Sequence, residues 1–276
     1  MRDRAIRTFF RSKTGVLGAC LVFLFLLAAL LAPVLAPFDP EFQIDGEESQ
    51  SPSSRHWLGT TPLGEDMVSR ILHGARTSLK VGVISVAISC LAGLFLGVIA
   101  GYRGGWLDTL IMRAIDILMA FPSILLAITI VSILGRSLHS IMIAVGVVGI
   151  PVFARQVRAS VLSVRELEYV TASRALGAHA PRIVLRHILP ATMGPVIVLT
   201  SLRIATAILE SAGLSFLGLG GEAILEWGTM LAENKDHYAR LPHLVLAPGI
   251  AISLTVLAFN LFGDALRDAL DPRLHR

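Results

Sequence analysis

The chain has 276 residues, of which 54% are hydrophobic and only 16% are charged, with a formal net charge of +4. Its mean hydropathy is +0.71. Soluble domains carry about 25% charged residues, and the apolar residues here gather in long runs. The composition therefore excludes an ordinary water-soluble domain and predicts an all-α integral membrane protein with the lipid bilayer as its solvent.

The basic residues lie in short segments beside the apolar runs, with no aromatic-rich basic face between them. This pattern is typical of charges that orient a membrane protein and argues against a nucleic-acid partner. Cys20 and Cys90 both lie inside apolar runs. No cluster of His, Cys, Asp or Glu has metal-ligand spacing. We therefore expect no metal, no cofactor and no catalytic residue.

The first apolar run covers residues 16–36, and five basic residues precede it: Arg2, Arg4, Arg7, Arg11 and Lys13. A helix of this length spans a hydrocarbon core of about 30 Å. A cleaved signal peptide is the alternative, but its apolar region is normally about 7–15 residues long. We expect an uncleaved span, so that residues 1–36 form a cytosolic N-terminus and a first membrane helix.

Residues 37–78 are polar. The first part is acidic and rich in Pro and Ser, which indicates a loop. The second part becomes helix-like, with Met67, Ile71 and Leu72 on one side. We expect an external loop that ends in an interfacial helix leading into the next span.

Residues 79–276 are expected to form a core with five more spans, at about 79–101, 115–135, 141–154, 196–217 and 244–262. The third contains Phe121-Pro122 and the fourth Gly149-Ile150-Pro151. Membrane helices tolerate such breaks, because neighbouring helices and water satisfy the freed carbonyls. The last part of the chain, 263–273, is expected to be a short amphipathic helix at the cytosolic surface.

Charge gives the orientation of the six spans. With the N-terminus inside, sixteen Lys and Arg residues fall inside and seven outside. This asymmetry predicts that both termini face the cytosol. It also places the polar, arginine-rich segment 168–190 inside, between the fourth and fifth spans.

Segment 168–190 has the pattern of two short helices joined by a turn. Good helix formers precede Gly177, which can end a helix in the left-handed conformation, and Pro181 suits the first turn of a second helix running to about Leu189. An amphipathic connector resting on lipid headgroups is the alternative. A plain connector would not need a turn at its centre.

The segment resembles the cytosolic Glu-Ala-Ala loop of ABC importer permeases, in which Gly follows that triplet after three residues and Ile-x-Leu-Pro closes the loop. Here Thr171-Ala172-Ser173 stands at the triplet, Gly177 is the glycine, and Leu189-Pro190 closes the loop. Thr171, Ser173 and His187 depart from the pattern. The blocks HWLGTTPLGEDMVSRILHGARTSL, AFPSILLAI, ESAGLSFLGLG, EWGTML and AFNLFGDALRDALDP are similar, in order, to the second permease subunit of the dipeptide, oligopeptide and nickel importers.

The resemblance implies a type I importer permease in the bacterial inner membrane. Its implied partners are a second homologous permease, two ABC ATPase subunits and an extracytoplasmic substrate-binding protein. The loop, about 163–190, would be a coupling helix seated on the ATPase. Small residues would allow close docking, and charges at the edge would fix the register. The candidate coupling residues are Glu168, Thr171, Ala172, Ser173, Arg174, Gly177, Ala178, Arg182, Leu189 and Pro190.

Four charged residues lie in or beside the expected spans. Arg203 and Glu210 are seven residues apart on one helical face, and such groups usually face protein or water. They could line the pathway, meet the partner permease or form a structural ion pair. Arg113 and Asp116 have a spacing that allows a local pair. Pairing at the interface and a gating role are both considered for them.

Two other functions are considered. An intramembrane serine protease would need a histidine beside Ser215, and no histidine lies well inside an apolar run. An ion-coupled secondary transporter would carry repeats and embedded carboxylates, whereas Glu210 is the only carboxylate well inside an expected span. The chain has no GxxxxGK[ST] loop, so we expect a permease whose partners hydrolyse ATP. Peptides are the expected substrate, with nickel or glutathione-type ligands as alternatives.

Overall fold

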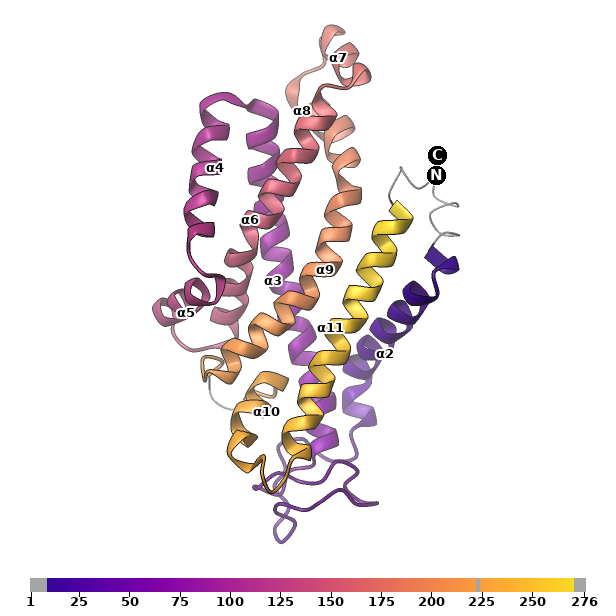
Figure 1. Cartoon of the computed structure of the whole chain (residues 1–276), viewed down its shortest axis with the longest axis vertical. Coiled ribbons are helices and arrows are strands. Elements are labelled where there is room, and N and C mark those ends of the chain that lie inside the picture. Colours follow the sequence, from indigo (N-terminus) through magenta and orange to yellow (C-terminus); the bar gives the residue numbers. More distant parts are fainter. Residues whose placement is uncertain (1–8, 222–223, 271–276) are drawn as a thin grey trace.

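The computed structural model describes residues 9–221 and 224–270. The described part of the chain is a helical bundle without a named strand (Figure 1). Its helices are α2 (Lys13–Leu35), α3 (Met67–Arg103), α4 (Gly105–Ala120), α5 (Ser123–Leu134), α6 (Leu138–Arg165), α7 (Glu168–Ala175), α8 (Ala180–Ile183), α9 (Leu189–Phe216), α10 (Trp227–Asn234) and α11 (His243–Leu270).

The predicted all-α membrane fold is confirmed. Among the described residues, five helical segments are long and apolar enough to cross a membrane, and α4 with α5 makes a sixth if this bent pair is one span. Large apolar side chains such as Phe23, Leu30 and Phe95 remain exposed on the outside of the bundle. In a membrane this surface faces lipid or a partner rather than water.

The break expected at Phe121-Pro122 in the third predicted span, 115–135, is present. Helix α4 begins at Gly105, and the axis turns by 95° between α4 and α5 at Phe121-Pro122. Proline disfavours helical backbone at the residue before it, and Phe121 is indeed extended. The break predicted in the fourth span is absent, because α6 continues through Pro151.

Helix α3 is longer than the second predicted span. The expected interfacial stretch and that span form one continuous helix, whose first turn is capped by Asp66 accepting a hydrogen bond of 2.8 Å from the Ser69 amide. At the other end of the chain, α11 continues to Leu270, so the predicted surface helix is an extension of the last span. Residues 271–273 of that prediction lie outside the described residues.

A glycine stripe allows α3 to pack closely on α6. Gly93, Gly97 and Gly101 recur every four residues along α3. A Cβ on Gly97 would lie 2.6 Å from the Ala154 carbonyl oxygen, and one on Gly101 would lie 2.8 Å from Val161 Cβ. Small residues at this spacing are how membrane helices approach without a hydrophobic driving force. Helices α2 and α11 pack together at the side of the bundle.

The loop between α2 and α3, residues 36–66, folds into a small lobe around one buried histidine; we call it the α2–α3 lobe. The His56 ring is buried, with Nδ1 2.8 Å from Asp66 Oδ1 and Nε2 3.0 Å from Glu47 Oε2. Phe38 stacks on it at 4.9 Å. The lobe lies at one end of the bundle, and α7 lies at the other (Figure 1).

Candidate functional site

The segment that follows α6 is a short helix held clear of the bundle. Helix α7 covers Glu168–Ala175, and Gly177 takes φ +83°, the left-handed conformation expected of it. An added Cβ at Gly177 would meet nothing within 4 Å, so the backbone angle and not crowding favours glycine here. The predicted turn at the middle of the segment is therefore present.

The base of this segment is packed, although its tip is exposed. Val170, Ile183 and Ile188 are buried in the main core cluster. At the tip, the Leu176 side chain is 89% exposed.

The candidate coupling residues divide by exposure. Ser173, Ala178 and Leu189 are partly buried. The exposed members are Glu168, Thr171, Ala172, Arg174, Gly177, Arg182 and Pro190. The exposed set runs from α7 to the start of α9 and contains both small and charged residues.

Two of the residues that depart from the family pattern touch each other. Ser173 Oγ lies 3.4 Å from His187 Nε2, and the Tyr169 ring meets the His187 ring edge-on at 5.8 Å. This polar pair joins α7 to the helix that follows the turn.

The predicted second short helix, from Pro181 to Leu189, is not a separate element. Helix α8 passes through a π-helical turn, Val184–Ile188, directly into α9, giving one continuous segment Ala180–Phe216 of 37 residues. Pro190 has no N–H for the carbonyl four residues earlier. The Leu189 amide donates to the Val184 carbonyl, five residues back, which is the signature of the π turn.

Within the spans, the structure brings Arg203 and Glu210 of α9 together. Arg203 Nη2 lies 3.5 Å from Glu210 Oε2, and their side chains are 15% and 32% exposed. The Arg203 Nε atom is buried and has no hydrogen-bond partner within the described part of the chain. Arg203 also reaches toward α6, since a Cβ on Gly149 would lie 3.2 Å from Arg203 Nη2.

The expected local pair between Arg113 and Asp116 is wrong. Asp116 accepts a hydrogen bond of 2.6 Å from Arg155 of α6. A second pair joins the same two helices: Arg158 of α6 binds both carboxylate oxygens of Asp108 of α4, at 2.6 and 2.7 Å. Arg113 is exposed. The i, i+3 spacing gave a possible partner on the same helix, but packing α4 on α6 supplied a better one.

A buried carboxylate at the far end of α9 escaped the sequence reasoning. Glu226 lies just before α10, is fully buried, and accepts hydrogen bonds from Ser211 Oγ at 3.2 Å and from Ser215 Oγ. Ser215 therefore contacts a carboxylate and not the histidine that a protease would require. Burial raises the pKa of Glu226 above its ordinary value, and the hydrogen bonds from Ser215 and Ser211 oppose that rise.

A second polar cluster joins the α2–α3 lobe to α10. Arg70 of α3 binds Glu65 of the lobe, and its Nη2 donates to Glu233 Oε2 of α10 at 2.6 Å. Burial raises the pKa of Glu233; Arg70 opposes that rise and Glu65 adds to it. Arg70 and Glu233 are 163 residues apart, so no local pattern could have paired them.

Two family models match this chain, one over its larger C-terminal part and one over its N-terminal part. Residues 93–276 match the family described as "binding-protein-dependent transport system inner membrane component". Residues 1–52 match the "N-terminal TM domain of oligopeptide transport permease C". The second match covers α2 and the start of the lobe.

Curated relatives are similar over nearly the full length. The chain is 46% identical to the dipeptide transport system permease protein DppC of Alkalihalophilus pseudofirmus, over 96% of this chain and 87% of the relative. It is 44% identical to the glutathione transport system permease protein GsiD of Pectobacterium atrosepticum, over 99% and 94%. The corresponding protein of Escherichia coli is 45% identical, over 97% and 89%.

Solved structures show the same fold. An inward-facing structure of the MetNI methionine ABC transporter superposes with a TM-score of 0.61 and 21% identity, over 74% of this chain and 98% of that one. An amino acid ABC transporter gives a TM-score of 0.58 and 15% identity, over 72% and 94%. The chain belongs to the binding-protein-dependent transport system inner membrane components, and is a multi-pass permease subunit of an ABC importer.

Proposed function

We propose that this chain is one of two homologous permeases that together form the pathway of an importer for short peptides. Two ABC ATPases would dock on one face and an extracytoplasmic binding protein on the other. The observation that supports this proposal is the exposed α7 segment on a buried base. An ATPase could bind the exposed part while the packed base keeps the segment in its conformation. Powered transport then follows if ATP-driven closure favours one arrangement of the spans by a few kcal/mol.

In this proposal, segment 168–190 is the coupling helix. The small side chains of Ala172 and Ala178 allow a cleft of the ATPase to approach the backbone, and Glu168 and Arg174 fix the register by their charge. Thr171, Ser173, Gly177, Arg182, Leu189 and Pro190 complete the surface and its turn. The hydrolytic chemistry belongs to the ATPases.

The orientation is also part of the proposal. The first described turn of α2, the last turn of α11 and α7 all point toward the same end of the bundle (Figure 1). With the excess of Lys and Arg at that end, both termini and the coupling segment face the cytosol. The α2–α3 lobe and α10 then face outward. The expected division into residues 1–36, 37–78 and 79–276 stays part of the proposal, although its second boundary falls inside α3 (Met67–Arg103).

The substrate class rests on the relatives. Their names give a dipeptide and glutathione, and both are short peptides with free amino and carboxylate groups. Arg203 and Glu210 are the pathway candidates within α9, because they carry charges of both signs and remain partly exposed. Asp116 and Arg113 lie on the exposed side of α4 and are candidates for the interface with the partner permease.

Cysteine cross-linking tests the coupling segment. Cys20 and Cys90 are first replaced by alanine, and Ala172→Cys and Ala178→Cys are introduced separately. Each should cross-link to the ATPase in the intact complex. Ser54→Cys, on the exposed surface of the lobe, is the control, and it should instead react with an impermeant thiol reagent added outside. Cross-linking of Ser54→Cys and not of the other two would contradict the topology and the coupling role together.

Purification of the complex with its binding protein tests the substrate. Mass spectrometry of the ligand that the binding protein retains should find a short peptide, glutathione included. A retained nickel chelate would refute the substrate class and leave the permease function intact.

A further inference from the structure

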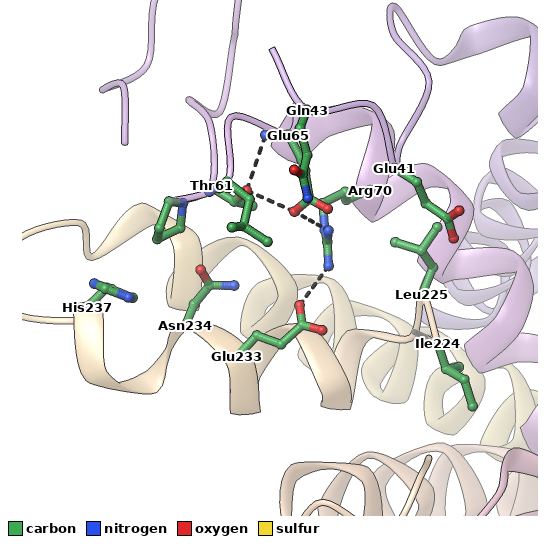
Figure 2. A pocket seen from close by; sticks show the side chains of 12 residues that line it. Glu41, Gln43, Thr61, Glu65, Arg70, Ile224, Leu225, Glu233, Asn234 and His237 are labelled. Atoms are coloured by element: carbon green, nitrogen blue, oxygen red, sulfur yellow. Dashed lines mark hydrogen bonds and ion pairs between the residues drawn. The ribbon is translucent and has the colours of Figure 1, made fainter. Parts of the chain in front are cut away.

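A pocket of about 530 Å³ lies between the α2–α3 lobe and α10, at the end of the bundle opposite α7. Its volume falls in the range of small-ligand and side-chain sites, about 300–1,000 Å³. Figure 2 shows that the lobe and α3 form one wall, with Glu65 and Arg70, and that α10 forms the other, with Glu233 and Asn234. The pocket is thus formed by the α2–α3 lobe with α3 and by α10, which have no part in the proposed coupling to the ATPase.

Arg70 lies at the centre of the pocket, and one of its donors has no acceptor. The residue is 6% exposed, and its Nε has no hydrogen-bond partner among the described residues. Its terminal nitrogens are taken by Glu65 and Glu233. A buried donor without a partner costs free energy that a bound acceptor removes. Arg70, which lines the pocket, therefore retains one donor whose hydrogen bond is unmet.

Acceptors outnumber that donor. The side chains of Glu41 and Gln43, and the side-chain oxygen of Asn234, line the pocket without a protein partner among the residues described. The charged residues of the lining are Glu41, Glu65 and Glu233 against Arg70, with His237 formally neutral. Their sum is an excess of two negative charges. The pocket therefore favours a cation that carries several N–H donors.

Apolar groups complete the lining. Pro62 and Leu63 from the lobe and Ile224 and Leu225 before α10 stand among the polar groups. A guanidinium or ammonium on an aliphatic stem matches such walls, because its stem buries against carbon while its head meets the carboxylates. A neighbouring backbone carbonyl of the same ligand would satisfy Arg70 Nε. A lysine or arginine within a polypeptide has all three features.

The charge of the lobe indicates where such a polypeptide comes from. Residues 36–66 contain seven carboxylates and one arginine, whereas the chain as a whole has a formal net charge of +4. Four of the carboxylates are exposed: Asp39, Glu41, Asp45 and Glu48. A concentrated negative surface accelerates the approach of a basic partner and fixes its orientation. The family is described as binding-protein-dependent, and the proposed topology turns this end of the bundle outward, where that protein arrives.

We propose that this pocket is a docking socket in which a Lys or Arg side chain of the external binding protein sits between Glu41 and Glu233, with its backbone carbonyl on Arg70. The proposal rests on the proposed function and adds a specific contact to it. The socket positions the binding protein over the permease and takes no part in ATP hydrolysis.

The test uses the complete transporter in nanodiscs with its own binding protein. Glu41→Gln with Glu233→Gln removes both charges, and the glutamine can still accept the hydrogen bond from Arg70. The affinity for the binding protein should fall about tenfold, equivalent to about 1.4 kcal/mol. Asp45→Asn with Glu48→Gln is the matched control. It removes the same charge from exposed positions of the lobe outside the pocket, and its affinity should stay within about twofold of the wild type.

Glu41→Gln alone guards against a folding defect, since the Glu41 side chain is exposed and has no partner to lose among the described residues. It should weaken docking by about threefold and reduce the dependence of the affinity on salt. Assembly with the partner subunits, measured by size-exclusion chromatography, verifies that each variant is intact.

The outcomes separate this inference from the proposed function. If the affinity for the binding protein falls equally in the pocket variant and in the Asp45/Glu48 control, the effect is only general electrostatic attraction by the lobe. That result would refute the socket. A wild-type affinity in the pocket variant would refute it directly. Binding of a labelled basic dipeptide to the wild-type transporter without binding protein, lost in the pocket variant, would assign the pocket to a small ligand instead. A wild-type complex that no binding protein stimulates would overturn the proposed function itself.

Discussion

Glu226→Gln should remove a pH dependence of stability that the wild-type permease shows. Burial raises the pKa of Glu226 above the ordinary value of 4.5, against the opposing hydrogen bonds of Ser215 and Ser211. Glu226 lies outside the spanning segments Ala180–Phe216 and His243–Leu270. When the folded-state pKa of an acid is raised, the folded chain holds more protons than the unfolded chain between the two pKa values.

The sign of the effect follows directly. The stability from Glu226 is complete below the unfolded pKa, falls as the pH rises toward the folded pKa, and does not change further above it. The slope within that window is at most about 1.4 kcal/mol per pH unit. With about 2–4 °C of Tm per kcal/mol for a chain of this size, the wild type should lose about 3–6 °C per pH unit.

Thermal unfolding of the permease in nanodiscs between pH 5 and pH 8 measures this. Trp227 is the next residue, is buried, and reports on the site by its fluorescence. Glutamine stays neutral and can still meet both serine hydroxyls, because a hydroxyl donates as well as accepts. Glu233 titrates in the same direction, so the difference between wild type and variant isolates Glu226. Parallel Tm curves for the two proteins would refute the reasoning.

Three further predictions follow from contacts between helices. Gly82→Ala should destabilise the bundle by about 1–3 kcal/mol, because its Cβ would lie 2.7 Å from Ile208 Cγ1; Gly249→Ala meets nothing within 4 Å and should stabilise it by about 0.5–1 kcal/mol in the same unfolding assay. A double-mutant cycle of Asp108→Ala and Arg158→Ala should give a coupling energy of about 0.5–1 kcal/mol, because the pair is partly exposed; a value near zero would show that water replaces the pair at no cost. His187→Ile combined with Ser173→Ala should keep the transport rate per ATP hydrolysed, because an apolar contact replaces the hydrogen bond, whereas Ser173→Ala alone should lower it by leaving the His187 nitrogen without its partner.

The sequence was sufficient where local chemistry decides the structure. Runs of apolar residues located the helices, and Gly177 marked a turn that only the left-handed conformation completes. The ordered blocks indicated the permease family, which the comparisons confirm. Each of these features depends on residues close together in the chain, and their energies are largely independent of how the helices pack.

Sequence reasoning failed where a distant helix offered a better partner. Asp116 prefers Arg155 to Arg113 because α4 lies against α6, and a spacing rule contains no information about that packing. Phe121-Pro122 marked a break in the hydrophobic run, but the 95° angle of the bend could not be predicted, since hydropathy measures composition and not direction. Arg70 and Glu233 meet across the fold. The burial of Glu226 depends on two serine hydroxyls of α9, Ser211 and Ser215, which donate hydrogen bonds to it; no local pattern indicates that contact.

Helix α9 joins the two ends of the molecule that matter to the proposals. The continuous segment Ala180–Phe216 has 37 residues, and at about 1.5 Å per residue it is about 55 Å long. Ile183 and Ile188 fix its first turns under α7, while Ser211 and Ser215 hold Glu226 near its last turn. A packed helix moves as a unit more readily than it bends, so a displacement imposed at α7 reaches the Glu226 cluster through one element rather than a chain of loops. The exception is the π turn Val184–Ile188, where the hydrogen-bond register is already shifted and a small rotation costs least. In the proposed coupling role, this π turn lies next to the segment on which the ATPase would dock. It is therefore the place where we expect α7 to change its angle while the rest of α9 keeps its direction.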